Sequence, residues 1–183
     1  MSGRREEILD AALELADERG LAAVSMRAVA DRVGVTPMAL YPHVGSKAAL
    51  LDGMVGRLLG GMAAEQVVYG VITTGAESDL EQVTNIARGM AGRWGMSAKV
   101  GRLTAIPSDT QGAYGLSAAP ATLDAVDGEA RRIVAECYEE ACRKLAEHRP
   151  RLDALAEALM EHETLDEEAA YRAAGMPRMG RSG

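Results

Sequence analysis

The sequence has few aromatic residues and few cysteines. Of its 183 residues, none is Phe, one is Trp, five are Tyr and two are Cys. Cys137 and Cys142 are too few for a disulfide framework, and their spacing matches no common metal or redox motif. We expect both to be small buried hydrophobes on one helix. Ala, Leu, Glu and Arg are abundant instead, which is typical of a soluble, mainly all-α protein.

The sequence also lacks long apolar runs and an excess of positive charge. No apolar core follows Met1, and runs such as residues 67–72 are too short to span a bilayer, so we expect a cytoplasmic protein without a membrane contact. The net charge of -7 argues against nonspecific nucleic-acid binding by the whole chain. Residues 1–62, however, carry seven Lys and Arg against eight Asp and Glu, so the acidity belongs to the remainder.

The first third of the chain has the pattern of a helix-turn-helix unit. Apolar residues recur at helical spacing before Gly20, which is a suitable helix stop. Ser25 can cap a second helix that ends at Gly34. Thr36 can cap a third helix with Pro37 at its first position.

Two further residues predict the limits of the next helices. Pro42 disfavours helical geometry at the preceding residue, so we expect the third helix to end at Tyr41. Ser46 can cap a fourth helix over residues 47–59.

Residues 25–54, SMRAVADRVGVTPMALYPHVGSKAALLDGM, resemble the N-terminal DNA-binding domain of the TetR family of repressors. The signature consists of Leu40, Tyr41, His43, Val44 and Lys47, and the likeness covers roughly residues 4–55. The resemblance implies that the third helix lies in the major groove of double-stranded DNA. It also implies a homodimer on a two-fold-symmetric site.

The resemblance gives each candidate DNA-binding residue a role by position. Thr36, Pro37, Met38 and Ala39 would face the bases, Arg27 would reach a guanine edge, and Tyr41, His43 and Lys47 would hold the backbone. Three of the base-facing residues are apolar, so contacts with thymine methyl groups would matter. Taken singly, such a charge or histidine is more often only solvated or packed.

Residues 57–174 resemble a different family, the FtsH-type ATP-dependent zinc metallopeptidases. The likeness rests on these pieces: Gly60-Gly61 with Ala64-Glu65, Thr73-Thr74-Gly75-Ala76 with Asp79-Leu80, Trp94-Gly95-Met96-Ser97, and Glu163-Thr164-Leu165. The resemblance implies that Asp79 stands at the position of the third zinc ligand. We therefore expect domains at 1–56 and 57–174, followed by a disordered tail at 175–183.

The motifs that would make this segment an enzyme are missing from the sequence. The only histidines are His43, His148 and His162, and no H-E-x-x-H occurs. No lysine follows a glycine, so there is no P-loop. One carboxylate does not hold zinc, so we expect no catalytic residue and no cofactor unless another chain supplies the histidines. Asp79 then suits the first turn of a helix, with Ser78 and Glu81 at capping-box spacing.

The second part of the chain reads as helices around one long irregular loop. We expect helices over 77–93, 127–147 and from Pro150 onward, and a last short helix with a capping box of Thr164 and Glu167. Residues 97–120 read as the loop, with short extended pieces near 103–106. On the helix that begins at Pro150, Leu152, Leu155, Ala156 and Leu159 share a face.

Three functions remain open from the sequence. The first is a TetR-like transcriptional regulator with an inactive peptidase-like segment, for which no small-molecule effector is identifiable. The second is a subunit of a zinc metallopeptidase that acts in proteolysis and completes its site with another chain, so that enzyme activity stays uncertain. The third is a non-functional fusion, which would expose apolar surface and dissolve poorly.

Overall fold

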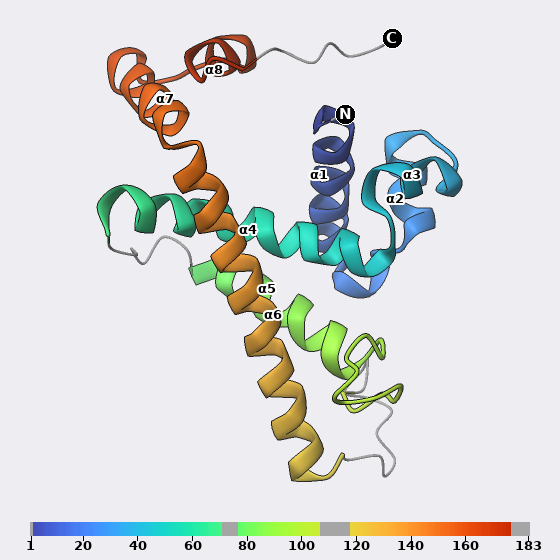
Figure 1. Ribbon diagram of the computed structural model, residues 1–183. Helices are drawn as coiled ribbons and strands as arrows, with labels where there is room; N and C mark the ends of the chain where they lie inside the picture. The colour runs from blue at the N-terminus through green and yellow to red at the C-terminus, as the bar shows by residue number, and fades with distance from the viewer. Residues whose placement is uncertain (1, 71–76, 107–117, 177–183) are drawn as a thin grey trace.

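The computed structural model describes residues 2–70, 77–106 and 118–176, and this part of the chain is all-α, as expected from the sequence. Its helices are α1 (Ser2–Arg19), α2 (Met26–Val33), α3 (Pro37–Val44), α4 (Lys47–Tyr69), α5 (Glu77–Gly92), α6 (Pro120–Glu147), α7 (Arg149–His162) and α8 (Glu167–Ala173), with a 3-10 turn at Leu21–Ala23. The first three helices form a head at one end of α4, and α5 and α6 pack against the rest of α4 (Figure 1).

The helix limits in the head follow the local signals of the sequence. Gly20 has φ 77° after the end of α1, and Gly34 has φ 76° after α2, a backbone region that favours glycine. The hydroxyl of Ser25 accepts a hydrogen bond from the Ala28 N–H at 3.1 Å, and Ser46 accepts one from the Ala49 N–H at 3.1 Å. These two predicted caps are therefore confirmed.

Two predictions for α3 need correction. Thr36 does precede the helix, but its side chain makes no capping hydrogen bond. Pro42 does not end the helix, which continues to Val44. The residue before a proline disfavours helical backbone angles, which makes Tyr41 locally unfavourable in a helix. Burial of both Leu40 and Val44 in the core requires this second turn of α3 and outweighs the local cost.

Helix α4 connects the head to the rest of the chain without a break. It is longer than expected and runs ten residues past position 59, through Gly60 and Gly61. The boundary expected between 56 and 57 lies inside this helix, and the division into two domains stays a prediction. Arg57 of α4 pairs with Glu6 and Asp10 of α1, so an ion-pair cluster lies across the junction.

One buried cluster includes residues from both sides of this junction. Leu9 of α1, Leu50 of α4, Ile86 of α5 and Ile133 of α6 belong to it, and all four are less than a tenth exposed. The helices of the second part therefore cover apolar surface of the head. This shared burial argues against a non-functional fusion, which would be expected to leave apolar core residues exposed.

The second part differs from the sequence expectations at three places. α6 begins at Pro120 rather than Asp127, because proline is well placed in a first helical turn. α5 already contains Glu77, so Ser78 lies inside the helix and cannot form the expected capping box. Residues 101–106 form no strand. The expected loop is otherwise seen as irregular chain at 97–106, and 107–117 lie outside the described residues.

The two cysteines are on one helix, as expected, but neither is fully buried. Cys137 and Cys142 of α6 are both free and half-buried. Cys137 packs against the main core, and burial raises the pKa of its thiol to about 11. It is thus a poor nucleophile at neutral pH.

Helices α7 and α8 follow the end of α6 (Figure 1), and the Arg149 guanidinium at the start of α7 donates to the Val67 carbonyl of α4 at 2.6 Å. No residue of α7 is fully buried, and Leu159 is 42% exposed, so the apolar face expected there is only partly covered. The last helix is capped by Asp166, which accepts from the Ala169 N–H at 2.7 Å, and not by the expected Thr164. Asp166 caps the helix in place of Thr164 because it is the residue directly before the first helical position.

No helix in the described ranges is long and apolar enough to cross a membrane. Of the expected disordered tail at 175–183, residues 177–183 are outside the part that the structure describes. Gly175 and Met176 follow the last helix, with φ 61° at Gly175.

Candidate nucleic-acid interface

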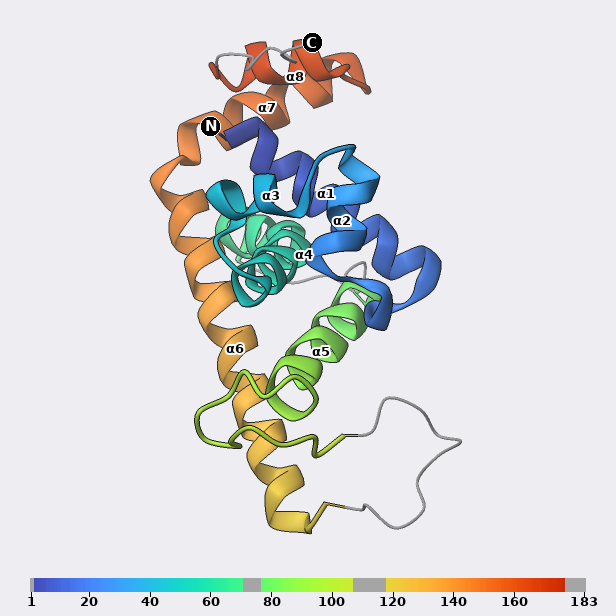
Figure 2. The same ribbon diagram turned by 90° about the vertical axis from the view of Figure 1, so that its right-hand side faces the viewer.

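The N-terminal half of α3 presents its side chains to solvent. Thr36, Pro37, Met38 and Ala39 are all exposed, and Met38 is exposed by 75%. Leu40, the next residue, is completely buried and fixes the helix on the head. All four predicted base-facing residues are thus open to solvent at the start of α3, a helix on the outside of the head (Figure 2).

Arg27 and Arg32 lie on α2 but differ in their partners. Arg32 donates to Glu18 at 2.7 Å and to Glu14 at 3.1 Å on α1, and its hydrogen bond with Glu18 lowers the pKa of that carboxyl. Arg27 is exposed and makes no hydrogen bond or ion pair within the described ranges. Arg32 therefore holds two helices together, while the Arg27 guanidinium is free for a ligand.

Tyr41 and His43 lie on the second half of α3. Tyr41 is 43% exposed and His43 is half-buried. Neither side chain makes a hydrogen bond to a described residue, so the phenol and the imidazole can both still donate to an acceptor such as phosphate.

Lys47 has a partner that the sequence did not indicate. Its ammonium lies over the ring of Trp94, 4.8 Å from the centroid, in a cation–π contact. Burial of this half-buried amine lowers its pKa. The contact joins the first residue of α4 to the segment after α5, so Lys47 connects the head to the second part of the chain. The contact of Lys47 with the DNA phosphate backbone stays a prediction.

Replacing Lys47 with glutamine should reveal this second role. We expect a loss of about 0.5–2 kcal/mol in the free energy of unfolding, since a partly desolvated cation–π contact disappears. The emission of Trp94, the only tryptophan, should change as well. Urea unfolding followed by fluorescence and circular dichroism measures both, with Lys144→Gln, whose ion pair with Glu140 is exposed, as the control. Equal behaviour of the two variants would contradict the contact.

Asp79 lies in the first turn of α5 and is half-buried. Glu77 lies in the same turn, and both carboxylates interact favourably with the N-terminal end of the helix dipole. His148 lies between α6 and α7, and His162 ends α7; both are exposed. Within the described residues, no three His, Cys, Asp or Glu side chains are grouped to hold a metal ion. Residues 73–76 of the peptidase-like signature lie outside the described part.

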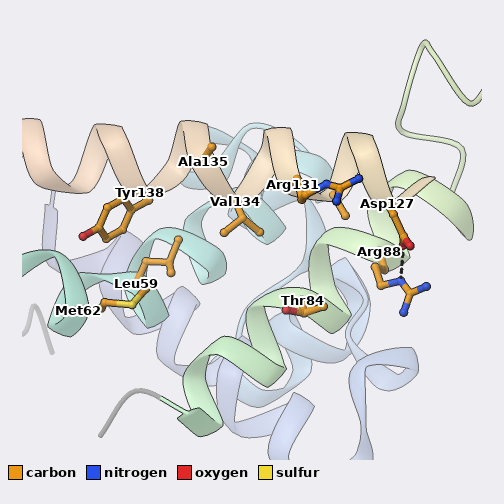
Figure 3. A pocket seen from close by; sticks show the side chains of 10 residues that line it. Leu59, Met62, Thr84, Arg88, Asp127, Arg131, Val134, Ala135 and Tyr138 are labelled. Carbon is orange, nitrogen blue, oxygen red and sulfur yellow. Dashed lines mark ion pairs between the residues drawn. The ribbon is translucent and has the colours of Figure 1, made fainter. Parts of the chain in front are cut away.

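A cavity of about 550 Å³ lies between α4, α5 and α6 (Figure 3). Leu59 and Met62 of α4 and Val134 of α6 form apolar walls. At one end, Arg88 donates to Asp127 at 3.0 Å, with Arg131 close by. Nothing in the sequence pattern indicated this cavity, because residues from three separate helices line it.

The fold and the α3 surface define a helix-turn-helix protein with an all-helical extension. Residues 8–54 match the family model described as bacterial regulatory proteins, tetR family, and residues 32–172 match that of peptidase family M41. The chain belongs to peptidase family M41 and begins with a TetR-family helix-turn-helix domain. Both predicted resemblances are confirmed. The two matches overlap within α2, α3 and the start of α4.

Curated relatives agree with the peptidase-family match. The chain is 47% identical over 132 residues to the ATP-dependent zinc metalloprotease FtsH 3 of Conexibacter woesei, which covers 70% of this chain and 18% of that protein. It is 48% identical over 126 residues to the ATP-dependent zinc metalloprotease YME1L of Drosophila melanogaster, which covers 68% of this chain and 17% of that protein. The chain thus spans less than a fifth of these relatives.

Proposed function

We propose that the protein is a transcriptional regulator that binds a specific double-stranded DNA sequence through α3. One observation supports the proposal: Thr36 and the first three residues of α3 are exposed, while the next residue, Leu40, is completely buried. A rigid helix with outward side chains suits the major groove. The free guanidinium of Arg27 adds a donor that can bind a guanine edge.

The proposed regulator acts as a homodimer in the cytoplasm. One eight-residue recognition helix gives little affinity alone, whereas two such helices on a symmetric site add their contacts. In this proposal the M41 segment carries out no proteolysis and supports the head through the shared core. The absence of H-E-x-x-H and of a P-loop from the sequence supports that view.

Selection from a library of random DNA duplexes tests the proposal. We expect an enriched motif with two inverted half-sites about one helical turn apart. Arg27→Ala should weaken binding to it by roughly 1–3 kcal/mol and relax the preference at one guanine position. Arg151→Ala on α7, an exposed arginine remote from α3, serves as the control. Recovery of unrelated sequences without a common motif would refute the proposal.

A second candidate function is supported by the family match and by Asp79 in the first turn of α5. In this alternative the chain is a metallopeptidase subunit whose Asp79 completes a zinc site with histidines of another chain. It requires zinc at stoichiometric occupancy and casein cleavage that Asp79→Ala abolishes. We expect neither: the purified protein should contain no zinc, and Asp79→Ala should change only stability, by about 0.3–1 kcal/mol. Elemental analysis measures the zinc content, and a casein-cleavage assay measures the peptidase activity; zinc at stoichiometric occupancy together with cleavage that requires Asp79 would favour this alternative.

A further inference from the structure

We propose that the cavity between α4, α5 and α6 binds an amphipathic carboxylate: a small molecule with an elongated apolar body and one anionic end. The site is separate from the α3 surface and from Asp79, and it does not depend on the proposed function. Its volume of about 550 Å³ is within the usual range for small-molecule sites. The chemistry of its lining determines the class of ligand.

The walls of the cavity select an apolar body. Leu59 is completely buried, Met62 is 8% exposed and Ala130 is 6% exposed, so these side chains offer a surface that excludes water on one side. Val134 of α6 points into the same space (Figure 3). Binding of a hydrocarbon chain there is favourable in proportion to the apolar area that the chain covers.

One end of the cavity selects a negative charge. Arg88 is paired with Asp127, while Arg131 has no ion pair or hydrogen bond among the described residues. Two guanidinium groups and one carboxylate therefore line this end of the cavity, which leaves a surplus positive charge beside the open apolar surface. A ligand carboxylate can accept two parallel hydrogen bonds from the Arg131 guanidinium.

The other end has a polar group that is poorly satisfied. The Tyr138 hydroxyl is buried, and burial, with the Cys142 thiol beside it, raises the pKa of the phenol. A thiol is a weak partner, and the hydroxyl makes no hydrogen bond of ordinary geometry in the described structure. Tyr138 and Arg131 both line the cavity and are seven positions apart on α6, roughly 10 Å at 1.5 Å per residue, so a ligand that fills the cavity is elongated.

Isothermal titration calorimetry with decanoate tests the proposal on the full chain. We expect saturable binding at one site per chain, and much weaker binding of decan-1-ol and decylammonium, which lack the negative charge. Arg131→Gln should weaken decanoate binding about tenfold, because the charge-assisted contact is lost. Arg151→Gln, which removes an exposed arginine elsewhere, should leave the binding unchanged.

Two more variants keep the test decisive if one of them fails to fold. Tyr138→Phe preserves the shape of the cavity and should alter the affinity without changing the thermal midpoint by more than a few degrees. Val134→Trp should fill the cavity and abolish binding. Absence of saturable heat, equal affinity for decan-1-ol, or equal affinity of the Arg131 and Arg151 variants would overturn the proposal. A decanoate affinity that falls as the protein concentration rises would also overturn the proposal, because a second copy of the chain would then cover the cavity.

Discussion

Replacing Leu40 with alanine is expected to lower the free energy of unfolding by about 2–5 kcal/mol and to abolish specific DNA binding. Leu40 is the completely buried contact of α3 with the head, and its loss leaves a cavity beneath a helix of only eight residues. The helix then loses the fixed orientation that major-groove recognition requires. Urea unfolding and binding to a selected duplex measure the two effects.

Met38 provides the matched control on the same helix. Its side chain is 75% exposed, so Met38→Ala should change stability by less than about 0.5 kcal/mol. Its DNA affinity should nevertheless fall by up to about tenfold, since apolar contact with a thymine methyl group is lost. If Met38→Ala were as destabilising as Leu40→Ala, or Leu40→Ala were neutral, the seating of α3 described above would be wrong.

The second large effect is expected at Glu129 of α6. This carboxylate is only 7% exposed and accepts from the Ser97 hydroxyl at 2.8 Å and from Arg132 at 3.2 Å. Ser97 in turn accepts from the Val100 N–H, so Glu129 holds the irregular segment after α5 on α6. Glu129→Gln should cost about 1.5–3 kcal/mol at pH 7, because charged hydrogen bonds at a buried site are lost.

The effect at Glu129 should depend on pH. The Arg132 guanidinium, and after it the Ser97 hydroxyl, hold the pKa of Glu129 below its ordinary value. A carboxyl with a lowered folded-state pKa stabilises the fold above its unfolded pKa of about 4.3, and this contribution disappears as pH falls through the folded-state pKa. The difference in stability between wild type and Glu129→Gln should therefore shrink below about pH 4.

Glu136 gives the control for this experiment. It pairs with the same Arg132 at 2.7 Å but its side chain is 62% exposed. Solvent screens such a pair, so Glu136→Gln should cost less than about 1 kcal/mol. Urea unfolding at pH 7 and pH 3.5 compares the variants. A Glu129→Gln difference that stayed constant over this range would contradict the assigned carboxylate network.

The sequence predicted those features of the fold that depend on near neighbours. The Ser25 and Ser46 caps and the Gly20 and Gly34 stops are confirmed, because a cap needs only side-chain and backbone groups a few residues apart. The same local reasoning failed at Pro42, where burial of Leu40 and Val44 outweighs the local preference. Propensity is only one contribution to where a helix ends.

The features that the sequence did not predict depend on distant residues. Lys47 was interpreted from its motif as a phosphate contact, and its stacking on Trp94 requires knowledge of how α4 and α5 pack. The cavity likewise depends on the crossing of three helices. Asp79 is the reverse case: the family likeness marked it as a zinc-ligand position, while the described residues contain no group of three His, Cys, Asp or Glu side chains that could hold a metal ion.

A fluorescence-anisotropy titration of the purified protein on its selected duplex, and on a scrambled duplex of the same composition, tests specific DNA binding most directly. At physiological salt we expect the selected duplex to bind at least about 1,000-fold more tightly, with both affinities falling as salt rises. Equal affinity for the two duplexes at both salt concentrations would contradict a sequence-specific regulator.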